Sequence, residues 1–146
     1  MSLQDEIPEF GKTLGEELLI PTRLYPKAVL PSIRKGLLKG MVHVTGGGFY
    51  DNIPRILPEG TTARVNADAW PELPVFSKLQ EWGNVDVKEM YRTFNMGIGM
   101  ILVVDPENLA AVKAQLEKQN EAVYEIGRIE EAGAERVIME GREFIG

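Results

Sequence analysis

The chain has 146 residues, of which 44% are hydrophobic and 26% are charged, and its formal net charge at pH 7 is −6. This length and composition are typical of one globular domain with its own core, so we expect residues 1–146 to form a single domain. The chain has no cysteine and one histidine, which excludes disulfides, thiolate metal sites and multi-histidine metal sites.

The first third of the chain predicts an irregular lead-in, a short strand and a helix. Residues 1–16 are polar and weakly periodic, which favours an extended segment. Residues 18–25 (LLIPTRLY) favour a short strand, and Pro26 is suited to the first position of a helix. The apolar positions that recur on one face of this predicted helix are Val29, Ile33 and Leu37.

The next segment predicts a strand that runs into a short helix. Residues 40–47 (GMVHVTGG) would form the strand, with Val42 and Val44 on one face and His43 on the other. Residues 49–57 (FYDNIPRIL) are typical of one or two helical turns broken by a proline.

The middle of the chain predicts a strand and two helices. Residues 61–70 (TTARVNADAW) alternate between apolar and polar, as a half-buried strand does. A helix beginning at Pro74 would bury the stripe Val75, Leu79 and Trp82. Asp86 and Glu89 have the spacing of a capping box, which predicts a short helix through Tyr91.

The last third predicts a buried strand, a helix and a terminal hairpin. Residues 95–105 (NMGIGMILVVD) are mostly apolar, which is typical of a central strand covered on both faces. Asp105 and Pro106 indicate a helix start, and the helix face comprises Leu109, Val112 and Leu116. Residues 122–130 and 135–140 favour two hairpin strands. The predicted fold class is therefore α+β, a mixed β-sheet packed with helices.

Charge is unevenly distributed along the chain. Residues 18–50 contain no Asp or Glu. The basic residues of this acid-free window are Arg23, Lys27, Arg34, Lys35 and Lys39. The window is interpreted either as an ordinary basic surface beside an acidic one or as a positive field around an anion site.

Composition also argues against two kinds of partner. The net charge of −6 disfavours general binding to nucleic acid. No apolar run approaches the ~20 residues that a membrane span needs. The first ten residues have no basic region followed by an apolar one, so they do not form a signal peptide. We therefore expect no membrane partner and a cytoplasmic location.

The run Thr45, Gly46, Gly47 and Gly48 is the strongest candidate site. Glycines between a strand and a helix let backbone N–H groups converge on an anion, to which Thr45 could add its hydroxyl. His43 could bind the same anion or act as general acid or base. Asp51 would repel an anion, and no P-loop motif is present. The alternative is a tight strand-to-helix turn without a ligand.

Four segments of the chain carry a family resemblance. They are GEELLIPTRLY (15–25), HVTGGGFYDNIPRILP (43–58), GNVDVKEMYRTFNMGIGMILVV (83–104) and YEIGRIEE (124–131). In order and spacing they resemble segments of aminoimidazole ribonucleotide synthetase, also called phosphoribosylformylglycinamidine cyclo-ligase, an enzyme family of purine biosynthesis. The resemblance runs from about Leu14 to Glu140 and is to the C-terminal domain of that fold.

The resemblance implies that part of the enzyme is missing from this chain. The N-terminal domain of the family supplies most of the ATP site, its acidic metal-binding residues and most of the dimer contact, and nothing here corresponds to it. The His-Ser-Asn-Gly-Tyr segment that opens the family's C-terminal domain is absent too. We therefore expect a truncated C-terminal domain that exposes apolar area, that self-associates or is only marginally soluble, and that has no turnover alone.

In the complete enzyme, the resemblance implies closure of the imidazole ring of formylglycinamidine ribonucleotide with ATP, giving aminoimidazole ribonucleotide, ADP and phosphate. ATP and Mg²⁺ are the implied cofactors, and neither is expected to bind tightly to this chain. The implied partners are the ribonucleotide substrate, the N-terminal domain and a second copy in a homodimer of the full-length enzyme.

The resemblance also assigns residues. Thr45, Gly46, Gly47 and Gly48 would hold the phosphate of the substrate, and His43 would face the same cleft as the candidate catalytic residue. The further candidate ligand contacts in matching segments are Arg23, Asn52, Arg55 and Asn95. No residue is assigned to a metal.

Three other functions remain open from the sequence. The chain could be a fragment of the related formylglycinamidine ribonucleotide synthetase, which has a far longer sequence. It could also be a stand-alone phosphate- or nucleotide-binding module without catalysis, which would bind its ligand with no partner domain. If the glycines are only a turn, the chain is an interaction domain.

Overall fold

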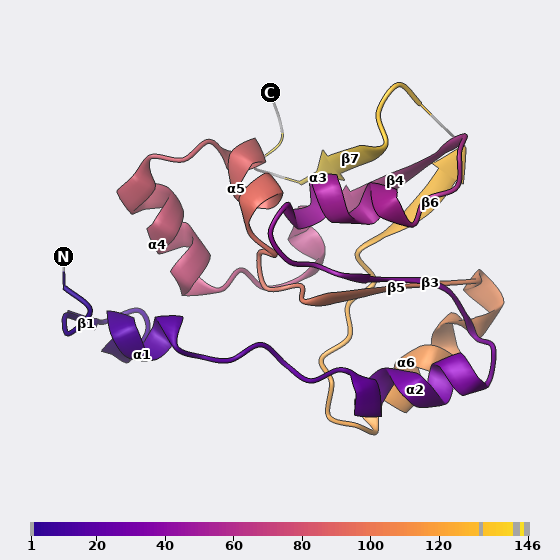
Figure 1. The fold of residues 1–146 in the computed structure, drawn as a ribbon, viewed down its shortest axis with the longest axis horizontal. Coiled ribbons are helices and arrows are strands. Elements are labelled where there is room, and N and C mark those ends of the chain that lie inside the picture. Colours follow the sequence, from indigo (N-terminus) through magenta and orange to yellow (C-terminus); the bar gives the residue numbers. More distant parts are fainter. Residues whose placement is uncertain (1, 132, 142–143, 145–146) are drawn as a thin grey trace.

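The computed structural model of the chain describes residues 2–131, 133–141 and 144, and Figure 1 shows its arrangement. The helices are α1 (Leu14–Leu18), α2 (Pro26–Arg34), α3 (Gly48–Asn52), α4 (Pro74–Gly83), α5 (Val87–Thr93) and α6 (Leu109–Glu117). The strands are β1 (Glu6–Ile7), β2 (Lys12–Thr13), β3 (Leu38–His43), β4 (Thr61–Asn66), β5 (Met100–Val104), β6 (Gly127–Glu131) and β7 (Val137–Glu140). The fold is α+β, as the sequence predicts.

A two-stranded ribbon lies between two layers of the molecule. β3 and β5 are antiparallel, with Val42 opposite Ile101 and His43 opposite Met100. In Figure 1 this ribbon runs between α2 and α6 on one side and the layer of α3, β4, β6 and β7 on the other. Each face of the ribbon therefore contributes to a different apolar cluster.

The larger cluster is built around stacked aromatic rings. Phe49 of α3 is 0% exposed, and its ring lies 5.6 Å from the rings of both Trp70 and Tyr91. The indole N–H of Trp70 donates to the carbonyl oxygen of Met96 over 2.9 Å, so its one polar atom is satisfied inside the core. Because Val42 belongs to the same cluster, the ribbon is fixed to α3 and α5.

A second, smaller cluster joins α2 and α6 to the other face of the ribbon. Its buried members are Ala28, Val29, Val112 and Leu116. A partly buried polar contact joins the two helices, because Ser32 donates to Gln115 Oε1 over 2.5 Å and Gln115 donates to the carbonyl oxygen of Ala28 over 2.9 Å. The polar side chain at 32 thus takes the place that the sequence pattern assigns to Ile33, which is 42% exposed.

The three-stranded sheet has the order β6-β4-β7, with β6 antiparallel and β7 parallel to β4. Arg64 of β4 forms ion pairs with Glu130 of β6 and Glu140 of β7. One guanidinium therefore bridges all three strands on their polar face. The predicted hairpin of the last two strands is wrong, because β4 lies between them.

Other predicted elements exist, but the strands predicted at 40–47, 61–70 and 95–105 have different bounds, and no residue of the helix from Pro74 is buried, so the predicted buried stripe is wrong. The structure places helices or helical turns from Pro26, Gly48, Pro74, Val87 and Pro106, and strands at 38–43, 61–66 and 100–104. Along β3, Val42 is buried and His43 is exposed, as the alternation predicts. Asp105 precedes its helix as predicted, but its carboxylate pairs with Lys39 over 3.0 Å instead of capping.

Three predictions near the strands and the amino terminus are wrong. β5 is not central: within the described residues it pairs with β3 alone. Residues 2–16 are not an irregular lead-in, because β1 and β2 form a hairpin and Thr13 and Glu16 make a capping box that starts α1. Residues 20–25 form no strand and cross between the two ends of the molecule as an extended segment (Figure 1).

The end of α1 and the extended segment after it carry exposed apolar side chains, as expected for a domain that lacks its partner. The exposed fractions are 51% for Leu18, 82% for Leu19, 55% for Ile20 and 86% for Leu24. Self-association of the chain stays a prediction. Among the described residues, no helix is long and apolar enough to cross a bilayer.

Replacing Phe49 with Ala should lower the free energy of unfolding by about 3–5 kcal/mol, because the change leaves a cavity among stacked rings. Urea-induced unfolding followed by tryptophan fluorescence would measure this. Leu24→Ala is the matched control, since that side chain is 86% exposed and its loss should change stability by less than about 0.5 kcal/mol. Equal effects of the two changes would contradict the described core.

The Arg64 bridge predicts a specific acid sensitivity. Hydrogen bonding to Arg64 lowers the pKa of Glu130 below its ordinary value of 4.5. Glu130 therefore stabilises the fold above pH about 4.5, and this contribution disappears as the pH falls through the lower pKa of the folded state. Thermal midpoints measured from pH 7 to pH 3 should fall less steeply for Glu130→Gln than for the parent. Glu131→Gln, one residue further along β6, should behave as the parent does.

Candidate functional site

The candidate site begins where β3 ends, at His43. The imidazole is exposed, and its ring meets the ring of Tyr25 edge-on, with centroids 5.9 Å apart and an interplanar angle of 66°. The backbone of Gly99 lies beneath the same tyrosine, because a Cβ atom at residue 99 would overlap its hydroxyl oxygen. Burial raises the pKa of Tyr25, which keeps its proton at neutral pH. Tyr25 thus flanks His43 as a neutral phenol.

The loop after β3 is held by one buried side chain. Asn52 of α3 is 3% exposed, and its amide nitrogen donates to the carbonyl oxygens of Thr45 (3.3 Å), Gly46 (3.2 Å) and Gly48 (2.8 Å). The N–H of Gly48 closes the turn by donating to the carbonyl oxygen of Thr45 over 3.0 Å. Three carbonyl groups of the loop therefore point toward Asn52.

The geometry of the peptide bond then decides where the loop amides point. In a trans peptide the C=O and N–H groups point in opposite directions, and no described peptide bond is cis. The N–H groups of Gly46, Gly47 and Phe49 are joined to the three carbonyls that face Asn52, so they point away from it. Among the described residues no backbone or side-chain oxygen accepts from the N–H groups of Gly46 and Gly47.

Two of the three glycines have a packing reason to be glycine. Gly47 and Gly48 have φ values of +97° and +52°, which side chains other than glycine rarely adopt. A Cβ at Gly48 would also overlap the carbonyl oxygen of Tyr91 and lie 2.9 Å from that of Phe94. The turn interpretation of the glycine run therefore accounts for Gly47 and Gly48.

Gly46 is different, because nothing lies within 4 Å of where its Cβ would be. Packing does not explain this glycine, which lies exposed at the outer side of the loop with its N–H pointing outward. The carboxylate of Asp51 lies on the other side of Gly47, with Oδ2 3.1 Å from the position of a Cβ there. As the sequence suggests, this carboxylate opposes an anion at the loop.

The other predicted contacts are distributed unevenly. Asn95 closes a turn by accepting from the N–H of Gly97 over 2.9 Å, directly after the carbonyl of Phe94 that borders Gly48. Arg55 is exposed after α3. Arg23 is committed elsewhere, because it pairs with Glu121 over 3.0 Å. The structure thus gathers His43, the glycine loop and Asn95, and it gives Asn52 a role in holding the loop.

Sequence reasoning did not single out the residues that surround this group. Tyr25 contacts His43 across the sheet from a segment predicted to be a strand, and no local pattern indicates that contact. Tyr50, inside α3, lies 5.6 Å from both Lys88 and Arg92 of α5, close enough for cation–π attraction. Two cations thus border α3, and they lie outside the acid-free window in which positive charge was expected.

The residues present do not fit a metal. Among the described ranges, no group of three His, Asp or Glu side chains converges into a site for an ion. Asp51 supplies one carboxylate beside the loop, and Mg²⁺ needs several oxygen ligands. This part of the chain therefore offers no Mg²⁺ centre.

Comparison with known proteins places the chain in a family. The profile of the family described as AIR synthase related protein, C-terminal domain, matches residues 1–140. The phosphoribosylformylglycinamidine cyclo-ligase of Brevibacillus brevis is 50% identical over 144 residues, which is 99% of this chain and 41% of that protein. The one of Bacillus subtilis is 48% identical over 129 residues, which is 88% of this chain and 37% of that protein. The chain thus spans about two fifths of these curated relatives.

A solved structure agrees on the fold. The protein described as tt0281 from Thermus thermophilus superposes with a TM-score of 0.54 at 22% identity, covering 80% of this chain and 35% of that chain. At this identity the likeness concerns the fold alone.

Two glycine variants distinguish a glycine that is required by packing from one whose Cβ would enter open space. Gly48→Ala should destabilise the fold by about 3 kcal/mol or more, because the new methyl group meets the backbone of α5 at a positive φ. Gly46→Ala should change the free energy of unfolding by less than about 0.5 kcal/mol, since its methyl group enters open space. Chemical denaturation of both variants measures this, and equal destabilisation would contradict the loop geometry.

Proposed function

Because this chain belongs to the AIR synthase related family as its C-terminal domain, we propose that it is the C-terminal part of a phosphoribosylformylglycinamidine cyclo-ligase. The complete enzyme would use ATP to activate the amide oxygen of formylglycinamidine ribonucleotide. An internal nitrogen of the substrate would then attack the carbon of that amide, displace phosphate and close the imidazole ring.

The proposed role of this chain is to hold the phosphate of the ribonucleotide. The observation that carries this role is the pair of N–H groups of Gly46 and Gly47, which point away from Asn52 and for which the described residues provide no acceptor. Backbone amides in this arrangement are suited to an anion. The hydroxyl of Thr45, which is exposed beside them, could add a third donor.

The ring of His43 supplies the candidate acid–base group. It is exposed at the end of β3, two residues before the loop, and Tyr25 supports one edge of it. A phosphate held by the loop would bring the rest of the ribonucleotide near this imidazole. His43 would then contact the substrate or exchange a proton with it.

In this proposal, ATP and Mg²⁺ bind mainly to the part of the complete enzyme that corresponds to the unmatched part of the relatives. The described residues offer no acidic cluster for Mg²⁺, so we expect ATP and Mg²⁺ to bind where that part contributes. The proposal further includes cytoplasmic location, a homodimer of the complete enzyme, and single-domain folding of residues 1–146.

Calorimetric titration of the chain with formylglycinamidine ribonucleotide, and separately with ATP, tests the proposal. The ribonucleotide should bind, and Asp51→Asn should raise its affinity severalfold by removing the carboxylate beside Gly47. His43→Ala should weaken binding while leaving the fold intact, because the side chain is exposed. Lys35→Ala, a basic residue at the far end of α2, serves as the charge control.

Three results would change the conclusion. Affinity that falls with Lys35→Ala as much as with His43→Ala would indicate general electrostatic attraction. Tight binding of an unrelated nucleotide would favour a stand-alone binding module. Absence of ribonucleotide binding, both alone and after addition of the N-terminal part of a relative, would leave the glycines as a turn.

A further inference from the structure

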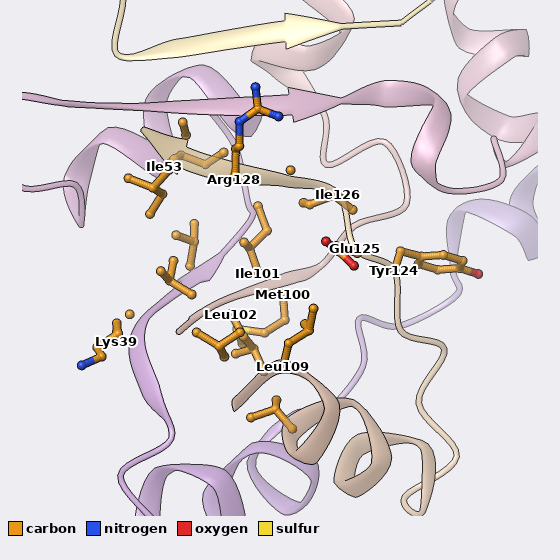
Figure 2. Close-up of a pocket in the computed structure, with 18 of the residues that line it drawn as sticks. Lys39, Ile53, Met100, Ile101, Leu102, Leu109, Tyr124, Glu125, Ile126 and Arg128 are labelled. Atoms are coloured by element: carbon orange, nitrogen blue, oxygen red, sulfur yellow. The ribbon is translucent and has the colours of Figure 1, made fainter. Parts of the chain in front are cut away.

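A groove separates the β3-β5 ribbon from the three-stranded sheet. Its volume is about 670 Å³, and Figure 2 shows its lining. One wall is β5, which within the described residues pairs with β3 alone. The opposite wall is β6, which pairs with β4 alone in the same part of the chain. The groove therefore lies between two strands that each have one unpaired edge.

The hydrogen-bond register identifies the unpaired groups of β5. The N–H of Val44 donates to the carbonyl oxygen of Gly99 over 3.0 Å, so this opposite pair is a hydrogen-bonded one. Such pairs alternate along an antiparallel ladder, so Ile101 and Val103 also bond to β3. The N–H and C=O groups of the residues between them then point to the free edge. These residues are Met100 and Leu102, since the register with β3 shifts beyond Val103.

The same reasoning applies to β6. The N–H of Asn66 donates to the carbonyl oxygen of Ile126 over 2.8 Å, and the register continues without a shift. Arg128 and Glu130 therefore bond to β4, whereas the backbone groups of Gly127, Ile129 and Glu131 point away from it. Both walls of the groove thus present free peptide groups on every second residue.

The remaining two sides of the groove are apolar. Ile53 and Ile101 line the side toward the larger cluster, and Leu109 with Leu102 lines the side toward α6 (Figure 2). The charged side chains of Lys39, Glu125 and Arg128 also border it. An occupant must therefore satisfy hydrogen bonds at two edges and contact apolar side chains on both faces. An extended peptide does both, because its N–H and C=O groups point sideways and its side chains point up and down.

We propose that this groove receives one additional β-strand, which joins β5 to β6 and makes one continuous sheet. The strand comes from the part of the protein that precedes the matched segment in the longer relatives, since this chain spans only 41% of the Brevibacillus brevis protein and corresponds to its C-terminal domain. β5 and β6 each contain five residues, so the strand needs about five residues, or roughly 17 Å. It carries apolar side chains at nearly every position and no proline, because both of its faces are covered.

This assignment goes beyond the proposed catalytic role and is independent of it. It concerns how the domain is completed, and it requires neither ribonucleotide nor turnover. It also accounts for one sequence prediction that the structure overturns: β5 has the apolar pattern of a central strand, and the additional strand gives it a second neighbour.

Residue-resolved hydrogen exchange tests the proposal. In the chain alone, the amides of Leu102 and Ile129 should exchange at least tenfold faster than those of Ile101 and Arg128, which lie in the ladders. Addition of the separately expressed part of the Brevibacillus brevis protein that precedes the matched segment should slow the first pair at least tenfold. The second pair should change little.

A proline variant tests the edge directly. Ile129→Pro removes an amide that points away from β4, so the variant should fold with an unchanged thermal midpoint but lose the protection given by the added part. Ile129→Thr keeps the amide and should keep that protection. The proposal would be overturned if, in the chain alone, the edge amides were already as protected as the ladder amides, or if their protection rose with the concentration of the chain alone. It would also be overturned if the added part associated with the chain while the edge amides still exchanged fast, or if Ile129→Pro kept the protection.

Discussion

The structure depends on the close approach of Gly48 to the carbonyl ends of α5. No side chain fits between this residue and the carbonyl oxygens of Tyr91 and Phe94, so α3 and α5 meet at backbone distance. That distance brings Phe49 against Tyr91 and Trp70 and closes the larger core. The same contact positions the start of α3, from which Asn52 reaches back to the loop. The contact of Gly48 with α5 therefore determines both the packing of the core and the shape of the candidate site.

Much of the fold follows from local patterns in the sequence. Prolines at 26, 74 and 106 mark helix starts because the residue has no N–H to leave unpaired there. Strand pairing does not follow in this way, because neither the apolar run 100–104 nor the mostly charged strand 127–131 indicates which strands it pairs with. The burial of Ser32 in place of Ile33 likewise depends on Gln115, which lies on another helix 83 residues away.

The candidate site was predictable in part for the same reason. The glycine run after a strand indicated an anion-binding loop, and the family resemblance named the substrate. Neither indicated that the three glycines differ: Gly48 is required by α5, Gly47 by its backbone angle, and only Gly46 lies open. The contact of Tyr25 with His43 was also not predictable from the sequence. It requires Gly99 to have no side chain, and only the folded structure shows that Tyr25 lies over Gly99.

The extended segment of residues 20–25 acts as a strap of fixed length. At one end, Ile7 and Leu14 are buried and Phe10 contacts Trp82 of α4, which anchors the amino-terminal hairpin. At the other end, Tyr25 is held over Gly99. An extended residue spans roughly 3.3–3.6 Å, so deleting one residue of the strap would break the contacts at one of its two ends. The number of residues between these anchors is thus a mechanical constraint on evolution of the chain, whatever side chains the strap carries.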